Sequence, residues 1–114
     1  MKTEVTVIGG GAAGLMAAIT AKKNGRDVVI LERKERILKK VLVTGNGRCN
    51  LSNINATNEN YFGIENRKQD INHILNNFLP NDVIDFFENE VGIICNEESR
   101  GKLYPLSGQA ASIV

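Results

Sequence analysis

The stretch TEVTVIGGGAAGLMAAITAKKNGRDVVILE, residues 3–32, decides the fold. It begins with a β-branched run over 3–8, which predicts a strand, and continues into a helical apolar pattern over 12–24. A second apolar run over 27–31 predicts another strand and leads directly into Glu32. A strand, a glycine turn, a helix and a second strand in this order make the βαβ unit of a Rossmann-like α/β domain. The sequence therefore predicts a dinucleotide-binding fold.

Three glycines between the first strand and the helix have the spacing G-x-G-x-x-G. Gly9 permits the tight turn out of the strand, Gly11 lets a pyrophosphate approach the backbone, and Gly14 lets the helix pack closely on the sheet. The N-terminus of the helix adds unpaired N–H groups and a partial positive charge. Glu32 has the spacing expected of an acid that binds a ribose hydroxyl. We interpret these residues as a dinucleotide site; a glycine-rich turn that serves only packing is the alternative.

The composition fits one soluble globular unit, because 114 residues are too few for two full domains. A net charge of +1 gives no reason to expect nucleic acid or an anionic membrane as a partner. The apolar runs are too short to span a bilayer, and the N-terminus does not resemble a signal peptide. Cys49 and Cys95 lack C-x-x-C spacing, which favours two thiols in a reducing cytoplasm over a disulfide. We expect no metal site.

A second candidate site is the loop TGNGRCN, residues 44–50. Two glycines around Asn46 permit positive φ and inward-facing N–H groups, a nest suited to an anion or a polarised ring oxygen. Arg48 adds a cation with a bidentate fork. An ordinary surface loop has the same composition, so the residues alone leave both interpretations open. The preceding basic run over 33–40 favours a solvated connection over a cationic rim near a cofactor.

Further along the chain, apolar spacing predicts amphipathic helices over 70–79 and 82–90, the second capped by Asn81 or Asp82. His73 lies on the polar side of the first helix, where we expect a surface residue and not a catalytic base.

Two short runs near the end of the chain, over 92–95 and 103–106, predict a β-hairpin with a polar turn between them. Pro105 favours an edge position or the end of its strand. Ser107 is the expected N-cap of a helix that follows. Two parallel strands and a few fragments do not complete a doubly wound sheet, so we expect the opening segment of a larger protein.

Three blocks of the sequence resemble the HI0933-like family, flavoproteins also described as aminoacetone-oxidase-like or NAD(P)/FAD-dependent oxidoreductases. The blocks are VIGGGAAGLMAA at 7–18 with LER at 31–33, KKVLVTGNGRCNLSN at 39–53, and GKLYPLSGQAASIV at 101–114. The first is shared with many flavoproteins, and the second is highly specific. Together they extend from one end of the chain to the other.

The resemblance implies FAD as the cofactor, NAD(P)H as electron donor, and electron or hydride transfer through FAD to an unknown small molecule. It places the glycine turn on the pyrophosphate, the acid on the adenosine ribose, and the second block near the flavin. The residues of the chain offer no convincing catalytic acid or base, so the catalytic residues stay unknown, and Cys49 is expected as a packing residue or flavin neighbour. The cofactor-binding residues that it implies are Gly9, Gly11, Ala12, Ala13, Gly14, Glu32, Arg33, Thr44, Gly45, Asn46, Gly47, Arg48, Cys49 and Asn50.

The sequence departs from the family in two respects. Many relatives have glycine where this chain has Leu38, and members of the family are several times longer. We therefore expect residues 1–114 to form the N-terminal segment of an FAD/NAD(P)-binding Rossmann-like domain that is incomplete by itself. The alternatives are a catalytically inactive fragment that needs the rest of the protein or a partner chain, and an NAD-binding dehydrogenase domain. Glu32 also suits NAD, but the loop over 44–50 argues against it.

Overall fold

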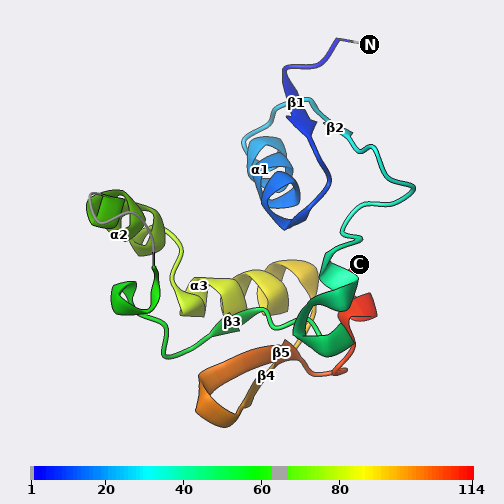
Figure 1. Cartoon of the computed structure of the whole chain (residues 1–114). Helices are drawn as coiled ribbons and strands as arrows, with labels where there is room; N and C mark the ends of the chain where they lie inside the picture. Colours follow the sequence, from blue (N-terminus) through cyan, green and yellow to red (C-terminus); the bar gives the residue numbers. More distant parts are fainter. Residues whose placement is uncertain (1, 63–66) are drawn as a thin grey trace.

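The computed structural model describes residues 2–62 and 67–114 and contains two groups of elements (Figure 1). The first group has two parallel strands, β1 (Val5–Ile8) and β2 (Val28–Leu31), which are joined by helix α1 (Ala12–Lys23). This arrangement confirms the predicted βαβ unit. The helix ends at a glycine in the left-handed conformation, which costs glycine little because it has no Cβ.

Helix α1 covers one face of the β1–β2 sheet. The side chain of Val7 lies against the start of the helix, whereas Thr6 and Ile8 point to the other side and are exposed. Ile8 is 87% exposed, and Leu31, its partner in the parallel register, is 54% exposed. Parallel sheets are normally buried on both faces. The second face of this sheet is therefore an apolar surface suited to further packing.

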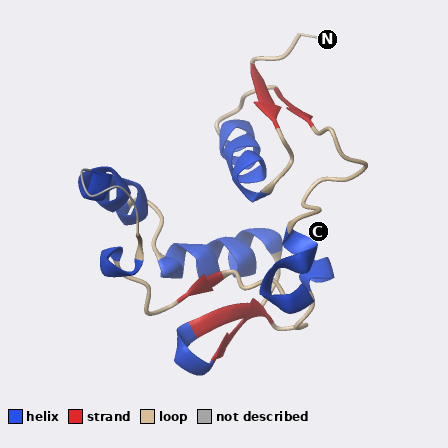
Figure 2. Ribbon diagram, viewed as in Figure 1, coloured by secondary structure: helices blue, strands red, loops and turns tan. Residues whose placement is uncertain are grey.

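The second group contains a small antiparallel sheet with the strand order β3-β5-β4 (Figure 2). Its strands are β3 (Ser52–Asn53), β4 (Cys95–Glu98) and β5 (Lys102–Pro105). Strand β5 lies in the centre and supplies three consecutive buried side chains, Leu103, Tyr104 and Pro105, of which Leu103 is only 2% exposed. Cys49 and Ala110 are buried as well, and the Leu51 N–H donates to Leu103 O of this strand. The main core of the described chain therefore lies here.

Helices surround this sheet. Helix α3 (Pro80–Asp85) continues into the π-helical segment η4 (Phe86–Val91) and contacts β3, while α2 (Lys68–Asn76) lies further out (Figure 1). The remaining elements of the described residues are short helical turns: η1 (Val41–Gly47), which is interrupted by non-helical angles at Thr44, Gly45 and Asn46, η2 (Asn58–Asn60), η5 (Ser99–Gly101) and η6 (Ala110–Ile113). Segments η1 and η6 lie side by side, which brings the middle of the sequence next to its last residues.

Two predictions near the end of the chain are wrong in position. The hairpin exists, but its first strand is Cys95–Glu98 and not 92–95, because Ile93 donates its N–H to Phe87 O and closes the preceding helix. Polar residues are tolerated in this strand because it is an edge strand of a small sheet. Ser107 does not cap an α-helix; its Oγ accepts the Gln109 N–H at 3.2 Å before the short turn η6.

The caps and ends of the helices also differ from the predicted ones. Leu79, and not Asn81 or Asp82, is the N-cap of α3, and Pro80 takes the first helical position, where its missing N–H has no cost. Asp82 still serves the helix end, because its carboxylate accepts the Leu79 N–H at 2.6 Å. The helix predicted over 70–79 begins at Lys68 and ends at Asn76. Within the described ranges no helix is long and apolar enough to cross a membrane.

Candidate cofactor-binding site

The glycine turn between β1 and α1 brings the helix unusually close to the strand. Gly9 has φ +98° and donates its N–H to Leu31 O at 2.8 Å. A Cβ on Gly14 would lie 2.0 Å from the carbonyl oxygen of Gly9. Any side chain at position 14 would therefore push the helix away from the sheet, which agrees with the packing role expected from the spacing.

The start of α1 is open to a ligand. Gly11 is the N-cap with φ −80°, and a Cβ there would meet no atom of the described residues within 4 Å. Ala12 and Ala13 are small, and no described side chain hydrogen-bonds to this helix end. The first N–H groups of a helix have no partner within the helix and favour negative charge. The residues present therefore fit the pyrophosphate of a dinucleotide.

Glu32 lies directly beside this turn. Its carboxylate accepts the Gly10 N–H at 2.8 Å and the Lys34 N–H at 2.7 Å. These two hydrogen bonds, that from Lys34 first, hold the pKa of Glu32 below its ordinary value of 4.5, so the group is ionised at neutral pH. Each carboxylate oxygen keeps a further acceptor site, which a ribose hydroxyl can use.

Gly10 is a site residue that the G-x-G-x-x-G spacing leaves unspecified. A Cβ at this position would lie 2.5 Å from Cγ2 of Ile37 and 3.4 Å from Oε2 of Glu32. Its signal in the sequence was the run of three consecutive glycines, in which Gly10 is the middle one. The connection over 33–40 folds back onto this glycine, because Leu38 donates its N–H to Gly10 O at 2.8 Å.

Leu38 adopts φ +55°, a conformation that favours glycine. This backbone geometry explains the glycine that the resemblance expects at the same position. Arg33, the other predicted residue in this region, is exposed next to Glu32.

The loop Thr44–Asn50 has the positive φ angles that its composition permits. The angles are +54° at Gly45, +55° at Asn46, +81° at Gly47 and +60° at Cys49. The Cys49 N–H donates to Thr44 O at 3.0 Å, and the Cys49 side chain is buried. Cys49 and Cys95 are both free thiols. Cys49 therefore packs inside the loop, one of the two roles that the resemblance implies.

The guanidinium of Arg48 is paired within the protein. Its two terminal nitrogens donate to the two carboxylate oxygens of Glu98, with Nη1 3.1 Å from Oε2. Its Cζ lies 4.2 Å from the centroid of the Tyr104 ring. The hydrogen bonds that Arg48 donates to Glu98 hold the pKa of Glu98 below its ordinary value and raise the pKa of Arg48. Glu98 was not predicted as a site residue, and its polar surroundings in the sequence gave no signal for it.

The predicted site residues thus form two clusters. The glycine turn and Glu32 form the first, and the Thr44–Asn50 loop packs with β4, β5 and η6 in the second. The segment containing Ile37 and Leu38 contacts Gly10 and leads directly into η1, so it connects the two clusters.

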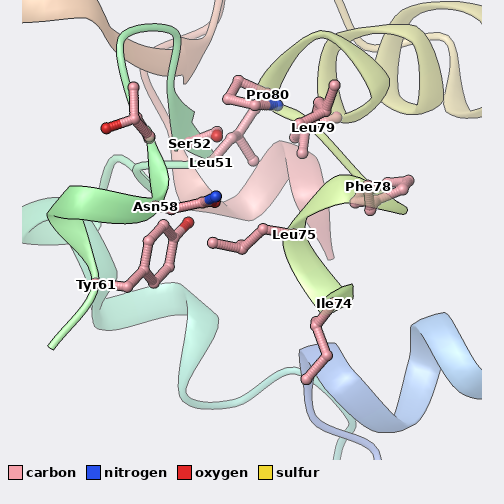
Figure 3. Close-up of a pocket in the computed structure, with 12 residues that line it drawn as sticks. Leu51, Ser52, Asn58, Tyr61, Ile74, Leu75, Phe78, Leu79 and Pro80 are labelled. Atoms are coloured by element: carbon pink, nitrogen blue, oxygen red, sulfur yellow. The ribbon is translucent and has the colours of Figure 1, made fainter. Parts of the chain in front are cut away.

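A separate hollow of about 530 Å³ lies beyond the second cluster, between β3, η2 and the helices α2 and α3 (Figure 3). In the view, the side chains of Tyr61 and Leu75 point into it from opposite sides. The amphipathic pattern over 70–79 was its sequence signal, although the hollow itself was not predicted. It is lined by Leu51, Ser52, Ala56, Thr57, Asn58, Tyr61, Ile74, Leu75, Phe78, Leu79, Pro80 and Val83, none of them a predicted site residue.

Comparison with known families agrees with the geometry of the glycine turn. Residues 3–114 match the family described as the HI0933-like protein Rossmann domain. The chain belongs to this family. The HI0933-like match confirms the resemblance in the sequence and the Rossmann-like α/β fold.

Three relatives that this chain resembles are named for different activities. It is 40% identical over 112 residues to a 3-dehydro-bile acid delta(4,6)-reductase of Clostridium scindens, covering 96% of this chain and 26% of the relative. It is 30% identical over 102 residues to a ribosomal RNA dihydrouridine synthase of Haemophilus influenzae, covering 90% and 25%. It is 46% identical over 37 residues to the FAD-dependent oxidoreductase dbaF of Emericella nidulans, covering 32% and 8%. The chain spans about a quarter of the length of the first two relatives.

Proposed function

We propose that this chain is the FAD-binding, N-terminal segment of the Rossmann domain of a flavin-dependent oxidoreductase. One observation carries the proposal: the N-terminus of α1 is open above Gly11, while Glu32 lies at the adjacent Gly10. A dinucleotide needs room for two phosphates, N–H donors directed at them, and an acceptor for a ribose hydroxyl nearby. The turn offers all three within a few residues.

Each part of the site has a separate role in binding. The N–H groups of Ala12, Ala13 and Gly14 donate to the pyrophosphate, and the carboxylate of Glu32 accepts from the adenosine ribose with Arg33 beside it. The loop Thr44–Asn50 extends toward the flavin end. FAD, when bound, supplies the redox chemistry of its isoalloxazine ring, and the protein supplies position and electrostatics.

We propose reduction as the direction of the reaction, with NAD(P)H as the electron donor. Two relatives have names that denote reductions, a 3-dehydro-bile acid delta(4,6)-reductase and a ribosomal RNA dihydrouridine synthase. Their substrates share no scaffold, so the proposal extends to the reaction class only. For this chain we propose a small-molecule substrate, because a net charge of +1 gives no reason to expect RNA as a partner. We also propose a cytoplasmic location, because Cys49 and Cys95 are free thiols.

By itself the chain is proposed to be catalytically inactive. Its parallel sheet has two strands and one apolar face that remains exposed, so the part of the domain that would enclose the flavin ring needs further structure. The chain would then bind FAD mainly through the adenosine diphosphate part and leave the isoalloxazine exposed.

A competition titration tests this function against the NAD-binding alternative. FAD is added to the purified chain, binding is followed by flavin fluorescence, and ADP or NAD⁺ is then added as a competitor. We expect saturable FAD binding, displacement by ADP, and weaker displacement by NAD⁺. Displacement by NAD⁺ at lower concentration than by ADP would instead support an NAD-binding domain.

A further inference from the structure

Two non-glycine residues of the loop Thr44–Asn50 have positive φ angles. Asn46 has φ +55° and Cys49 has φ +60°, both in the left-handed region. Glycine adopts this conformation freely, asparagine tolerates it, and cysteine rarely does. Such angles persist only where the surrounding structure imposes them. Two hydrogen bonds within the loop support it, from the Arg48 N–H to Gly45 O and from the Cys49 N–H to Thr44 O, and contacts outside the loop add to them.

The contacts come from β4 and β5. The Leu51 N–H donates to Leu103 O at 2.8 Å, which anchors the end of the loop to β5. A Cβ on Gly45 would lie 3.2 Å from Cε1 of Tyr104, so the loop closes tightly over this buried ring. Arg48 stacks on the same ring and forms the bidentate pair with Glu98. A planar guanidinium with two parallel hydrogen bonds is held in one orientation.

We propose that Glu98 and Tyr104 are positioning residues of the cofactor site, acting through Arg48. They keep the guanidinium against the protein, so that the loop retains its left-handed backbone and presents peptide groups, instead of a free cation, to the flavin end of FAD. The part of this inference that concerns FAD rests on the proposed function. The part that concerns the loop rests on geometry alone.

The two possible roles of Arg48 predict opposite effects when Glu98 is changed. If the guanidinium were a ligand of the cofactor that Glu98 restrains, removing the carboxylate charge would free a cation and strengthen the binding of an anion. If Glu98 positions the loop through Arg48, the same change releases the loop and weakens binding. The sign of the effect therefore distinguishes a positioning residue from a competing counter-ion.

The test compares the Glu98→Gln variant with a matched control, Glu97→Gln, on the same strand. Glu97 is exposed, so both variants lose one negative charge but only the first loses the pair with Arg48. Two quantities are measured: the amide signals of residues 44–50 in nitrogen–proton correlation spectra, and the affinity for FAD by fluorescence. The amide signals report on the loop without any cofactor.

We expect Glu98→Gln to shift and broaden the loop amide signals and to weaken FAD binding by about tenfold, whereas Glu97→Gln leaves both unchanged. The inference is overturned if the loop signals of Glu98→Gln match those of the unaltered chain, or if FAD binds more tightly. Absence of FAD binding by the unaltered chain would contradict the proposed function, while the amide signals would still decide whether Glu98 holds the loop.

Discussion

Gly11 and Gly14 are three residues apart in one turn, and a side chain would have a different effect at each. At Gly14 a Cβ would lie 2.0 Å from the carbonyl oxygen of Gly9, and at Gly11 it would enter open space. One glycine is therefore required by the fold, while the other is free to serve a ligand. The sequence motif requires glycine at both positions, and the structure shows that the reason differs between them.

Gly14→Ala is predicted to lower the free energy of unfolding by about 3 kcal/mol, because α1 must move away from β1. Urea denaturation followed by circular dichroism measures this change. Gly11→Ala is the matched control, and we expect it to change the free energy by less than about 1 kcal/mol. Equal effects of the two substitutions would mean that the close contact at Gly14 is not a constraint on the fold.

Leu38 offers a second test at a single residue, because its φ of +55° favours glycine. Leu38→Gly and Leu38→Ala both remove the side chain beyond Cβ, so the two variants differ only in whether Cβ is present, which is the atom that disfavours a positive φ. We predict that the glycine variant is more stable than the alanine variant by about 1 kcal/mol, the reverse of the usual order. Ala21→Gly within α1 is the control, with an expected loss of about 1 kcal/mol. A more stable alanine variant at 38 would contradict the left-handed geometry.

At the scale of elements, the Arg48–Glu98 pair joins η1 to β4 and makes stability depend on pH. The folded-state pKa of Glu98 lies below its ordinary value of 4.5, so the pair stabilises the fold above pH 4.5. The contribution is lost as the pH falls through the lowered pKa. The free energy of unfolding should therefore decrease below pH 4.5, and less steeply in Glu98→Gln. Identical pH profiles for both proteins would contradict a structural role for the pair.

Elements with strong local patterns were predictable, and those defined by distant contacts were not. The β-branched run of β1, the glycines and the apolar run of β2 predicted the βαβ unit and its parallel pairing. The short strand β3 was missed, because Ser52 and Asn53 are extended only by pairing with β5. Strand β4 was placed too early, since its polar residues resemble a turn.

In the candidate site, too, residues in local motifs were predictable and residues defined by distant contacts were not. The glycine turn and the loop at 44–50 were visible as motifs, whereas Glu98 enters the second cluster only through a contact with Arg48, fifty positions earlier in the chain. Gly10 was overlooked because its importance depends on Ile37 folding back over it. Sequence patterns thus predicted which segments matter, but not which side chains hold them in place.

At the scale of the whole molecule, the chain is open. Its accessible surface is 8403 Å², whereas a folded monomer of this mass exposes about 6,200 Å². Its radius of gyration is 15.4 Å, against about 13 Å for a compact domain of this length. The additional accessible surface includes the outer face of β1 and β2. This exposed face supports the proposal that the chain packs against further structure.

Ile8→Thr tests this uncovered face. Because Ile8 is 87% exposed, we expect the substitution to change the free energy of unfolding of this chain by less than about 0.5 kcal/mol. In a longer protein in which the face is covered, the same substitution should cost more than about 1 kcal/mol, since it would bury a hydroxyl. Chemical denaturation measures both. A large loss of stability in this chain would show that the face is already packed.

Binding of FAD at the open helix N-terminus of Gly11 is measured by the visible absorption spectrum of the protein after FAD is added and the excess removed. The measurement compares the unaltered chain with Gly11→Val, whose fold is checked by circular dichroism. We predict a retained flavin spectrum in the unaltered chain and none in a folded Gly11→Val. Equal retention by both, or no retention by the folded unaltered chain, would contradict the account.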